Sequence, residues 1–111
     1  MTDMIPVCRA DRLLPGLGVA ALVAGRQVAI FRLRDGSLRA IDNHDPFSGA
    51  NVLSRGLLGS LAGRTVVASP VYKQHFDLDT GRCLEDDSVA LQVHAVQERD
   101  GQVLLAGRAA A

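Results

Sequence analysis

Short segments rich in apolar and β-branched residues follow one another along the chain, separated by turns that contain glycine. Apolar residues are not spaced three and four positions apart over any long stretch, so helices are not expected. The segment 91–97, Leu-Gln-Val-His-Ala-Val-Gln, alternates in the way of a half-buried strand, which places His94 at the surface or rim. The predicted strands are residues 18–23, 27–33, 38–42, 64–68, 75–78, 82–84, 91–97 and 102–105.

The turns between these segments favour antiparallel hairpins. Asp35-Gly36 and Asp100-Gly101 each lie between two apolar runs, and both residue types tolerate the positive φ of a tight turn. About eight to ten short strands joined in this way predict an all-β sandwich or barrel. The 111 residues are expected to form a single domain, residues 1–111, with an ordered core from about residue 5 to residue 106.

Two connections interrupt the succession of strands, residues 43–56 and residues 69–74. Long loops are uncommon in compact domains and often carry function. We therefore look for functional residues in these two loops. The acidic pair at 86–87 is expected to be a solvated turn.

Charge and composition exclude several classes of function. Lys and Arg number 12, as do Asp and Glu, so the chain lacks the basic excess that nucleic acids or anionic membranes select. The longest apolar run, residues 19–24, is too short to span a bilayer. Residues 1–6 lack the features of a secretory signal. We expect a cytoplasmic protein in which Cys8 and Cys83 are reduced and act as small apolar fillers.

The two loops and their flanks resemble a Rieske iron–sulfur domain. The first loop follows Ala-Ile-Asp-Asn (residues 40–43), and the second precedes Phe-Asp-Leu-x-Thr-Gly-x-Cys-Leu (residues 76–84). In Rieske domains these loops carry Cys-x-His and Cys-x-x-His, which hold a two-iron cluster. The resemblance implies a Rieske-like antiparallel β-sandwich or barrel. Its four ligand positions fall on Asp45, Phe47, Ser69 and Tyr72.

None of these four residues is a cysteine or a histidine. Iron–sulfur clusters need thiolate ligands, and the phenyl ring of Phe47 has no lone pair, so we expect no cluster. A single hard metal ion on the oxygens of Asp45, Ser69 and Tyr72 is disfavoured because no histidine supports them. Asp45 and Ser69 are instead expected to cap local backbone N–H groups. No metal, cofactor or catalytic residue is expected in this chain.

The loss of a cluster removes a link between the loops. Phe47 and Tyr72, at the two former histidine positions, are predicted to pack together beside Pro46 and Pro70. Such an aromatic pair contributes roughly 0.5–1.5 kcal/mol beyond its buried area. In the alternative interpretation, both rings simply belong to the general core.

Residues 45–56, Asp-Pro-Phe-Ser-Gly-Ala-Asn-Val-Leu-Ser-Arg-Gly, and residues 66–78, Val-Val-Ala-Ser-Pro-Val-Tyr-Lys-Gln-His-Phe-Asp-Leu, are similar to the small subunit of bacterial assimilatory NAD(P)H nitrite reductase. The resemblance implies a non-redox subunit of an oxidoreductase of nitrogen assimilation. It would dock on a large subunit that carries FAD, sirohaem and a four-iron cluster and reduces nitrite to ammonium. The choice between NADH and NADPH stays open.

The former cluster-binding tip is the expected docking surface. Its candidate contact residues are His44, Phe47, Arg55, Tyr72, Lys73 and His75. For Arg55 and Lys73, ordinary solvated charge is the alternative interpretation. Two other functions also stay open: a Rieske-type ferredoxin that carries electrons to an oxygenase, and a free-standing regulatory or binding module on the same fold.

Overall fold

A computed structural model gives the structure of the chain and describes residues 4–106. The expected ordered core, from about residue 5 to residue 106, lies within this range. Within it the chain forms strands and two short 3-10 helices, and no α-helix. The elements are β1 (Met4–Arg9), η1 (Ala10–Arg12), β2 (Gly18–Val23), β3 (Arg26–Arg32), β4 (Leu38–Asp42), η2 (Leu53–Arg55), β5 (Leu57–Leu61), β6 (Arg64–Ala68), β7 (His75–Asp77), β8 (Val96–Arg99) and β9 (Gln102–Ala106).

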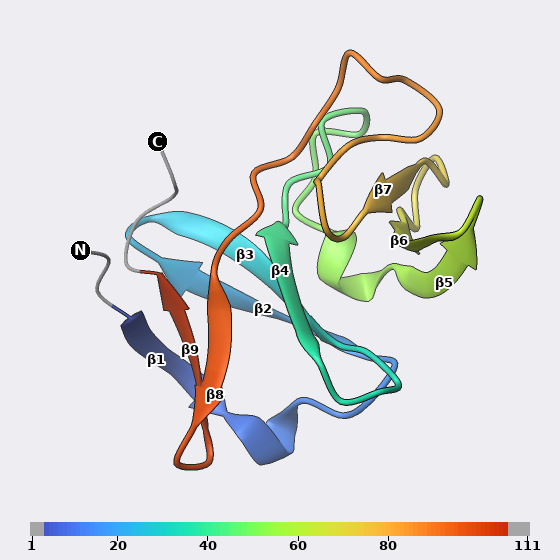
Figure 1. Cartoon of the computed structure of the whole chain (residues 1–111). Coiled ribbons are helices and arrows are strands. Elements are labelled where there is room, and N and C mark those ends of the chain that lie inside the picture. The colour runs from blue at the N-terminus through green and yellow to red at the C-terminus, as the bar shows by residue number, and fades with distance from the viewer. Residues whose placement is uncertain (1–3, 107–111) are drawn as a thin grey trace.

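Three antiparallel sheets of three strands each make up the fold, so the predicted all-β class is confirmed. Their strand orders are β1-β9-β8, β2-β3-β4 and β5-β6-β7. Figure 1 shows β5, β6 and β7 grouped at one side of the molecule and the β1-β9-β8 sheet at the other. The third sheet is the part of the fold that carries the two loops, because residues 43–56 lead into it and residues 69–74 connect β6 to β7.

Strand β3 lies at the centre because it buries both of its faces. Val28 and Ile30 belong to one core cluster, which they share with residues of η1 and β9. Ala29 and Phe31 belong to the other, which includes residues of η2, β6 and β7. Successive side chains of a strand point to opposite faces, so the unbroken apolar run of β3 separates two cores. The β2-β3-β4 sheet is thus the middle layer of the molecule.

Local patterning located most of the strands. Strands β2, β4 and β6 have the predicted bounds, and β3, β7 and β9 differ from them by a residue at one or both ends. Strands β1 and β5 were not predicted. The predicted strand 82–84 is wrong: Arg82 and Cys83 form only isolated bridges, to Ala90 and Phe76. The acidic residues Asp86 and Asp87 are exposed, as expected of a solvated turn.

The prediction for residues 91–97 needs correction. Strand β8 begins only at Val96, and the residues before it form an irregular segment alongside β4. His94 is 6% exposed and therefore buried, not at the surface or rim. Its ring Nε2 lies 2.8 Å from Asp42 Oδ1, and its backbone N–H donates to the carbonyl of Ala40. The apolar–polar alternation of the sequence therefore does not match burial here, since His94 is buried and Ala95 is exposed.

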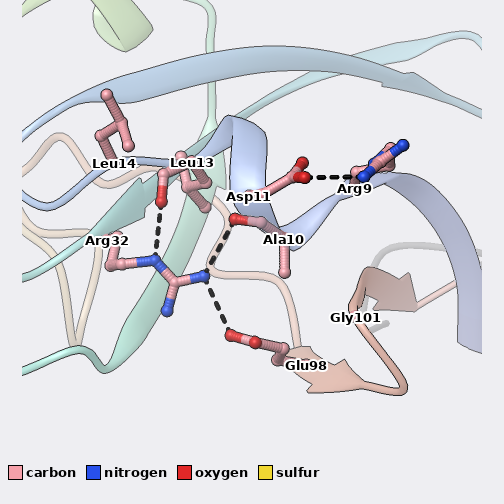
Figure 2. A pocket seen from close by; sticks show the side chains of 8 residues that line it. All are labelled: Arg9, Ala10, Asp11, Leu13, Leu14, Arg32, Glu98 and Gly101. Carbon is pink, nitrogen blue, oxygen red and sulfur yellow. Dashed lines mark hydrogen bonds and ion pairs between the residues drawn. The ribbon is translucent and has the colours of Figure 1, made fainter.

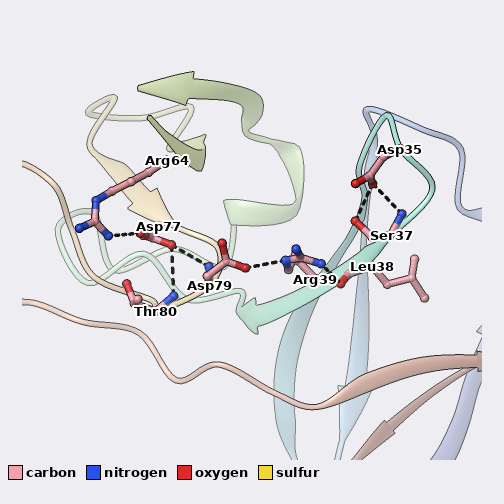
Figure 3. A network of polar contacts seen from close by, with 8 residues as sticks. All are labelled: Asp35, Ser37, Leu38, Arg39, Arg64, Asp77, Asp79 and Thr80. Carbon is pink, nitrogen blue, oxygen red and sulfur yellow. Dashed lines mark hydrogen bonds and ion pairs between the residues drawn. The ribbon is translucent and has the colours of Figure 1, made fainter. Parts of the chain in front are cut away.

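Turns and ion pairs join the sheets. Both predicted Asp-Gly pairs lie in turns, and in the second, Asp100 and Gly101 have φ of 54° and 77°. Arg39 of β4 donates to Asp79, in the turn after β7, at 2.7 Å, as Figure 3 shows. This partly exposed contact joins the turn after β7 to the middle layer. No helix in residues 4–106 has the length and apolar character needed to cross a membrane.

Candidate partner-binding site

The first loop, residues 43–56, folds back on a buried asparagine. The Asn43 side-chain amide donates to Gln27 Oε1 at 3.0 Å and to the Asn51 carbonyl at 3.2 Å. Its Oδ1 accepts the Ser54 N–H at 2.7 Å. These bonds tie both limbs of the loop to β3 and set its path. Sequence reasoning did not identify Asn43 as the anchor, because one polar residue at a strand end has no distinctive pattern.

Asp45 begins a closed turn within this loop. Its N–H donates to the Ala50 carbonyl, and its own carbonyl accepts the Gly49 N–H, both at 2.8 Å. The carboxylate Oδ1 accepts the Phe47 N–H at 2.9 Å, a local bond of the kind predicted for Asp45. The side chain is fully buried, with 0% of the residue exposed.

The second loop, residues 69–74, is closed in the same manner by Ser69. Its N–H donates to the Gln74 carbonyl at 2.9 Å, and its carbonyl accepts the Lys73 N–H at 3.1 Å. The hydroxyl oxygen accepts the Val71 N–H at 3.3 Å, as predicted. Ser69 is 1% exposed, whereas Val71 and Tyr72 at the apex are 45% and 61% exposed. The loop thus has a buried base and an exposed apex.

The two loops are joined at their bases. The Ser69 hydroxyl donates to Asp45 Oδ2 at 2.5 Å. Burial raises the pKa of Asp45, but hydrogen bonds from the Ser69 hydroxyl, the Phe47 amide and Ser48 outweigh this effect and hold the pKa below its ordinary value. Asp45 is therefore an ionised, fully paired carboxylate at neutral pH. The sequence singles out both residues but does not predict the bond between them.

The predicted contact between Phe47 and Tyr72 is wrong. Phe47 packs against Phe76 of β7 instead, with ring centroids 6.2 Å apart and an interplanar angle of 45°. Phe47 is purely apolar and joins the core cluster around Phe76. Tyr72 carries a hydroxyl and lies at the exposed loop apex. Phe47 thus follows the alternative, general-core interpretation, and Tyr72 does not.

The six candidate contact residues lie on or beside these loops. His44, Arg55, Tyr72 and Lys73 are exposed, and Phe47 and His75 are half-buried. His44 Nδ1 lies 3.2 Å from Asn51 Oδ1, and His75 Nδ1 lies 2.6 Å from Glu85 Oε2. The loops therefore present polar and cationic groups around an exposed tyrosine, and the role of these residues stays a prediction.

The residues at the four ligand positions do not fit a two-iron cluster. They offer a carboxylate, a phenyl ring, a hydroxyl and a phenol, whereas such a cluster requires thiolates with imidazoles. Both oxygens of Asp45 already accept hydrogen bonds, which also disfavours a single hard metal ion there. Cys83 is buried in the core and Cys8 lies on β1. Burial raises the pKa of both thiols, so they are poor candidates for ligands or nucleophiles.

An open cavity of about 400 Å³ lies beside η1, away from the loops. Figure 2 shows the Arg32 guanidinium at its wall, bonded to Leu13, Ala10 and Glu98. A further nitrogen of Arg32 donates to the Gly36 carbonyl at 3.0 Å. The guanidinium is thus fully engaged within the fold, and its bonds join η1 to β3 and β8. The other charged side chains that line the cavity are also paired, Arg9 with Asp11 and Glu98 with Arg32.

Comparison with known proteins decides the family. The chain matches the Rieske-like [2Fe-2S] domain family over residues 3–106. It is 46% identical to the nitrite reductase (NADH) small subunit of Salmonella typhimurium over 108 residues, which are 96% of this chain and 100% of the relative. The chain belongs to the nitrite reductase small-subunit family. The predicted resemblance is therefore confirmed.

Solved structures agree with this assignment. A crystal structure from Mycobacterium tuberculosis, assigned as an NADH-dependent nitrite reductase small subunit, superposes with a TM-score of 0.92 at 45% identity, covering 100% of this chain and 99% of that one. The ferredoxin of carbazole 1,9a-dioxygenase from Nocardioides aromaticivorans superposes with a TM-score of 0.80 at 25% identity, covering 95% and 98%. The family thus uses the fold of the Rieske ferredoxins.

A further relative is much longer than this chain. The nitrite reductase [NAD(P)H] large subunit of Klebsiella oxytoca is 40% identical over 97 residues, which are 87% of this chain but only 10% of that protein. A region homologous to this family therefore occurs inside a protein named as a large subunit.

Proposed function

We propose that this chain is the small subunit of an NAD(P)H-dependent nitrite reductase, and that it acts by docking on the large subunit and supporting its activity. The observation that carries the proposal is the 46% identity to a nitrite reductase small subunit over that relative's whole length. The location that fits this role is the cytoplasm.

The Klebsiella relative supports the choice of partner. One polypeptide named as a large subunit contains a region homologous to this chain. Two domains that are joined in one polypeptide in one organism are expected to associate with each other when they occur as separate chains in another organism. A domain that is covalently attached also has a high effective concentration, which a separate subunit must replace with a specific interface.

The subunit is proposed to carry no redox centre. The donor set at the four ligand positions, Asp45, Phe47, Ser69 and Tyr72, lacks the thiolates and imidazoles of a two-iron cluster. FAD, sirohaem and the four-iron cluster are accordingly expected on the large subunit. The chain contributes binding energy and positioning, and it has no catalytic residue of its own.

The expected contact surface is the exposed tip of the two loops. Tyrosine and arginine are enriched at interfaces because they combine apolar area with hydrogen-bonding groups. The apex of the second loop exposes Val71 and Tyr72 next to the cation of Lys73, and Arg55 is exposed on the first loop. His44, Phe47 and His75 complete the proposed surface.

Co-purification tests this surface. The double variant Tyr72→Ala/Lys73→Glu removes the exposed ring and inverts a charge, so we expect it to lose most of its co-purification with the large subunit. The matched control is Leu22→Ala/Arg99→Glu, which makes equivalent changes at exposed positions on β2 and β8. If the two double variants co-purify with the large subunit to the same extent, the contact surface lies on another face of the molecule.

The role itself is tested with the large subunit in hand. Nitrite-dependent NAD(P)H oxidation is measured with and without this chain, and we expect the rate to rise with the chain present until the complex is saturated. A chain that never co-elutes with the large subunit would favour a free-standing regulatory module. Stoichiometric iron and acid-labile sulfide, with visible absorbance, would favour a Rieske-type ferredoxin for an oxygenase system.

A further inference from the structure

Two buried polar residues at the bases of the loops are bonded directly to each other. Asp45 and Ser69, 24 residues apart in sequence, are 0% and 1% exposed. They occupy the two positions that align with the cluster thiolates. In a Rieske domain the two thiolates bind the same iron, so the corresponding residues are linked through metal. Here a hydroxyl donor and a carboxylate acceptor link the same two positions without metal.

This bond is the direct polar connection between the loops. Among the hydrogen bonds of residues 4–106, only the one from Ser69 Oγ to Asp45 Oδ2 joins residues 43–56 to residues 69–74. At 2.5 Å it lies in the short range of charge-assisted O–H···O⁻ bonds, which are roughly twice as strong as neutral ones. Loss of the hydroxyl would remove the 2.5 Å hydrogen bond to Oδ2 of this buried carboxylate.

Each partner also closes its own loop. Asp45 bonds through its backbone to Gly49 and Ala50, and Ser69 bonds through its backbone to Lys73 and Gln74. A movement of either residue therefore carries its whole turn with it. The exposed apex, Val71 to Lys73, is held through the same serine, whose hydroxyl oxygen accepts the Val71 N–H.

We propose that the Asp45–Ser69 hydrogen bond replaces a metal cluster as the link between the two loops, and that it thereby positions the Val71–Lys73 apex for contact with the large subunit. Asp45 and Ser69 are positioning residues, since neither is exposed enough to touch a partner. The positioning half of the inference rests on the proposed function, whereas the link between the loops does not.

Ser69→Ala is the decisive variant. Removing the hydroxyl is expected to increase amide hydrogen exchange in both loops together, at residues 47–50 and at residues 71–74. Affinity for the large subunit should fall by roughly tenfold, because the apex must then be ordered on binding. Ser69→Thr keeps the hydroxyl and should restore both exchange protection and affinity.

Asp77→Asn is the matched control. Asp77 is the other buried carboxylate among residues 4–106, and it lies at the far end of β7 from the second loop. It accepts hydrogen bonds from Arg64 and from the Asp79 and Thr80 amides. This variant should lower the melting temperature while leaving the affinity for the large subunit unchanged. If affinity were lost only because the whole protein is less stable, Ser69→Ala and Asp77→Asn would both show the loss.

The possible results are distinguishable. If Ser69→Ala leaves exchange in either loop unchanged, or if Ser69→Thr behaves like Ser69→Ala, the proposed link is wrong. If exchange rises but affinity equals that of the wild type, the positioning role is wrong. If the wild-type chain itself fails to bind the large subunit, both the proposed function and the positioning role are wrong. The hydrogen-exchange data would still show whether the Asp45–Ser69 bond links the two loops.

Discussion

At the scale of single residues, the side chains at the four positions that align with cluster ligands have different structural roles. Asp45 and Ser69 form a buried polar pair, Phe47 packs in the core against Phe76, and Tyr72 is exposed at a loop apex. Each fate follows from the chemistry of the side chain. Polar groups that are buried require partners, an apolar ring gains by burial, and a phenol readily keeps its hydroxyl in water.

Asp45 gives the stability of the fold a defined pH dependence. Its pKa is lowered in the folded protein, so its ionisation stabilises the fold at pH values above its unfolded pKa of about 3.9, and this contribution is lost as the pH falls through the lower, folded pKa. Asp45→Asn lacks this titration. We expect the difference in unfolding free energy between wild type and Asp45→Asn to be constant from about pH 7 to 5 and to shrink below about pH 4. Urea unfolding at each pH measures it.

Other carboxylates also titrate in this range, and both proteins share them. Taking the difference between wild type and variant removes their contribution. A difference that stayed constant down to about pH 2 would mean that Asp45 is not the ionised, paired group described above.

At the scale of elements, glycines in the connections between strands allow either a left-handed backbone conformation alone or also the close approach of another chain segment. Gly101, with φ 77°, lies in the β8–β9 hairpin turn, where an added Cβ would have no heavy atom within 4 Å. Gly81, with φ 80°, lies after β7, and an added Cβ would be 2.0 Å from the Leu91 carbonyl oxygen. The first glycine supplies only a backbone conformation, and the second also permits close approach of two chain segments.

The pair Gly101→Ala and Gly81→Ala separates these two effects. Gly101→Ala should destabilise the protein by roughly 1–2 kcal/mol, the cost of a left-handed conformation. Gly81→Ala carries the same backbone cost and also forces the residue 91 segment away, so it should lose a further 1–3 kcal/mol or so. Denaturant unfolding of both variants measures the difference. Equal losses would mean that the 91–95 segment is free to move aside.

At the scale of the whole molecule, cohesion comes from packing and polar contacts distributed over three sheets. Strand β3 separates two apolar cores, Arg32 joins η1 to β8, and Arg39 reaches Asp79 from the middle layer. Figure 3 also shows Arg64 of β6 paired with Asp77, whose pKa is lowered because this and other hydrogen bonds outweigh the opposing effect of burial. The loop-bearing sheet is connected to the rest by the Arg39–Asp79 pair and by the core cluster that includes Phe31, Leu53 and Phe76, whereas Arg64–Asp77 lies within that sheet.

Treatment with a chelator tests this account of the whole molecule. We expect the melting temperature of the purified chain to be unchanged by EDTA or by a ferrous-iron chelator, because the residues at the four ligand positions offer no thiolate or imidazole to a cluster whose binding would stabilise the fold. The preparation should also lack visible absorbance. A large drop in melting temperature on chelation would show that a metal is part of the native state.

The sequence by itself determined the strand-rich class, most strand positions and the lack of sulfur and imidazole at the four ligand positions. These properties are local, since alternation and turn residues act within a few positions, and ligand chemistry belongs to each side chain. Only the tertiary structure decided that Asp45 meets Ser69, that Phe47 meets Phe76 and that His94 is buried beside Asp42. Those pairings join residues 24, 29 and 52 positions apart, and they depend on how whole segments pack together.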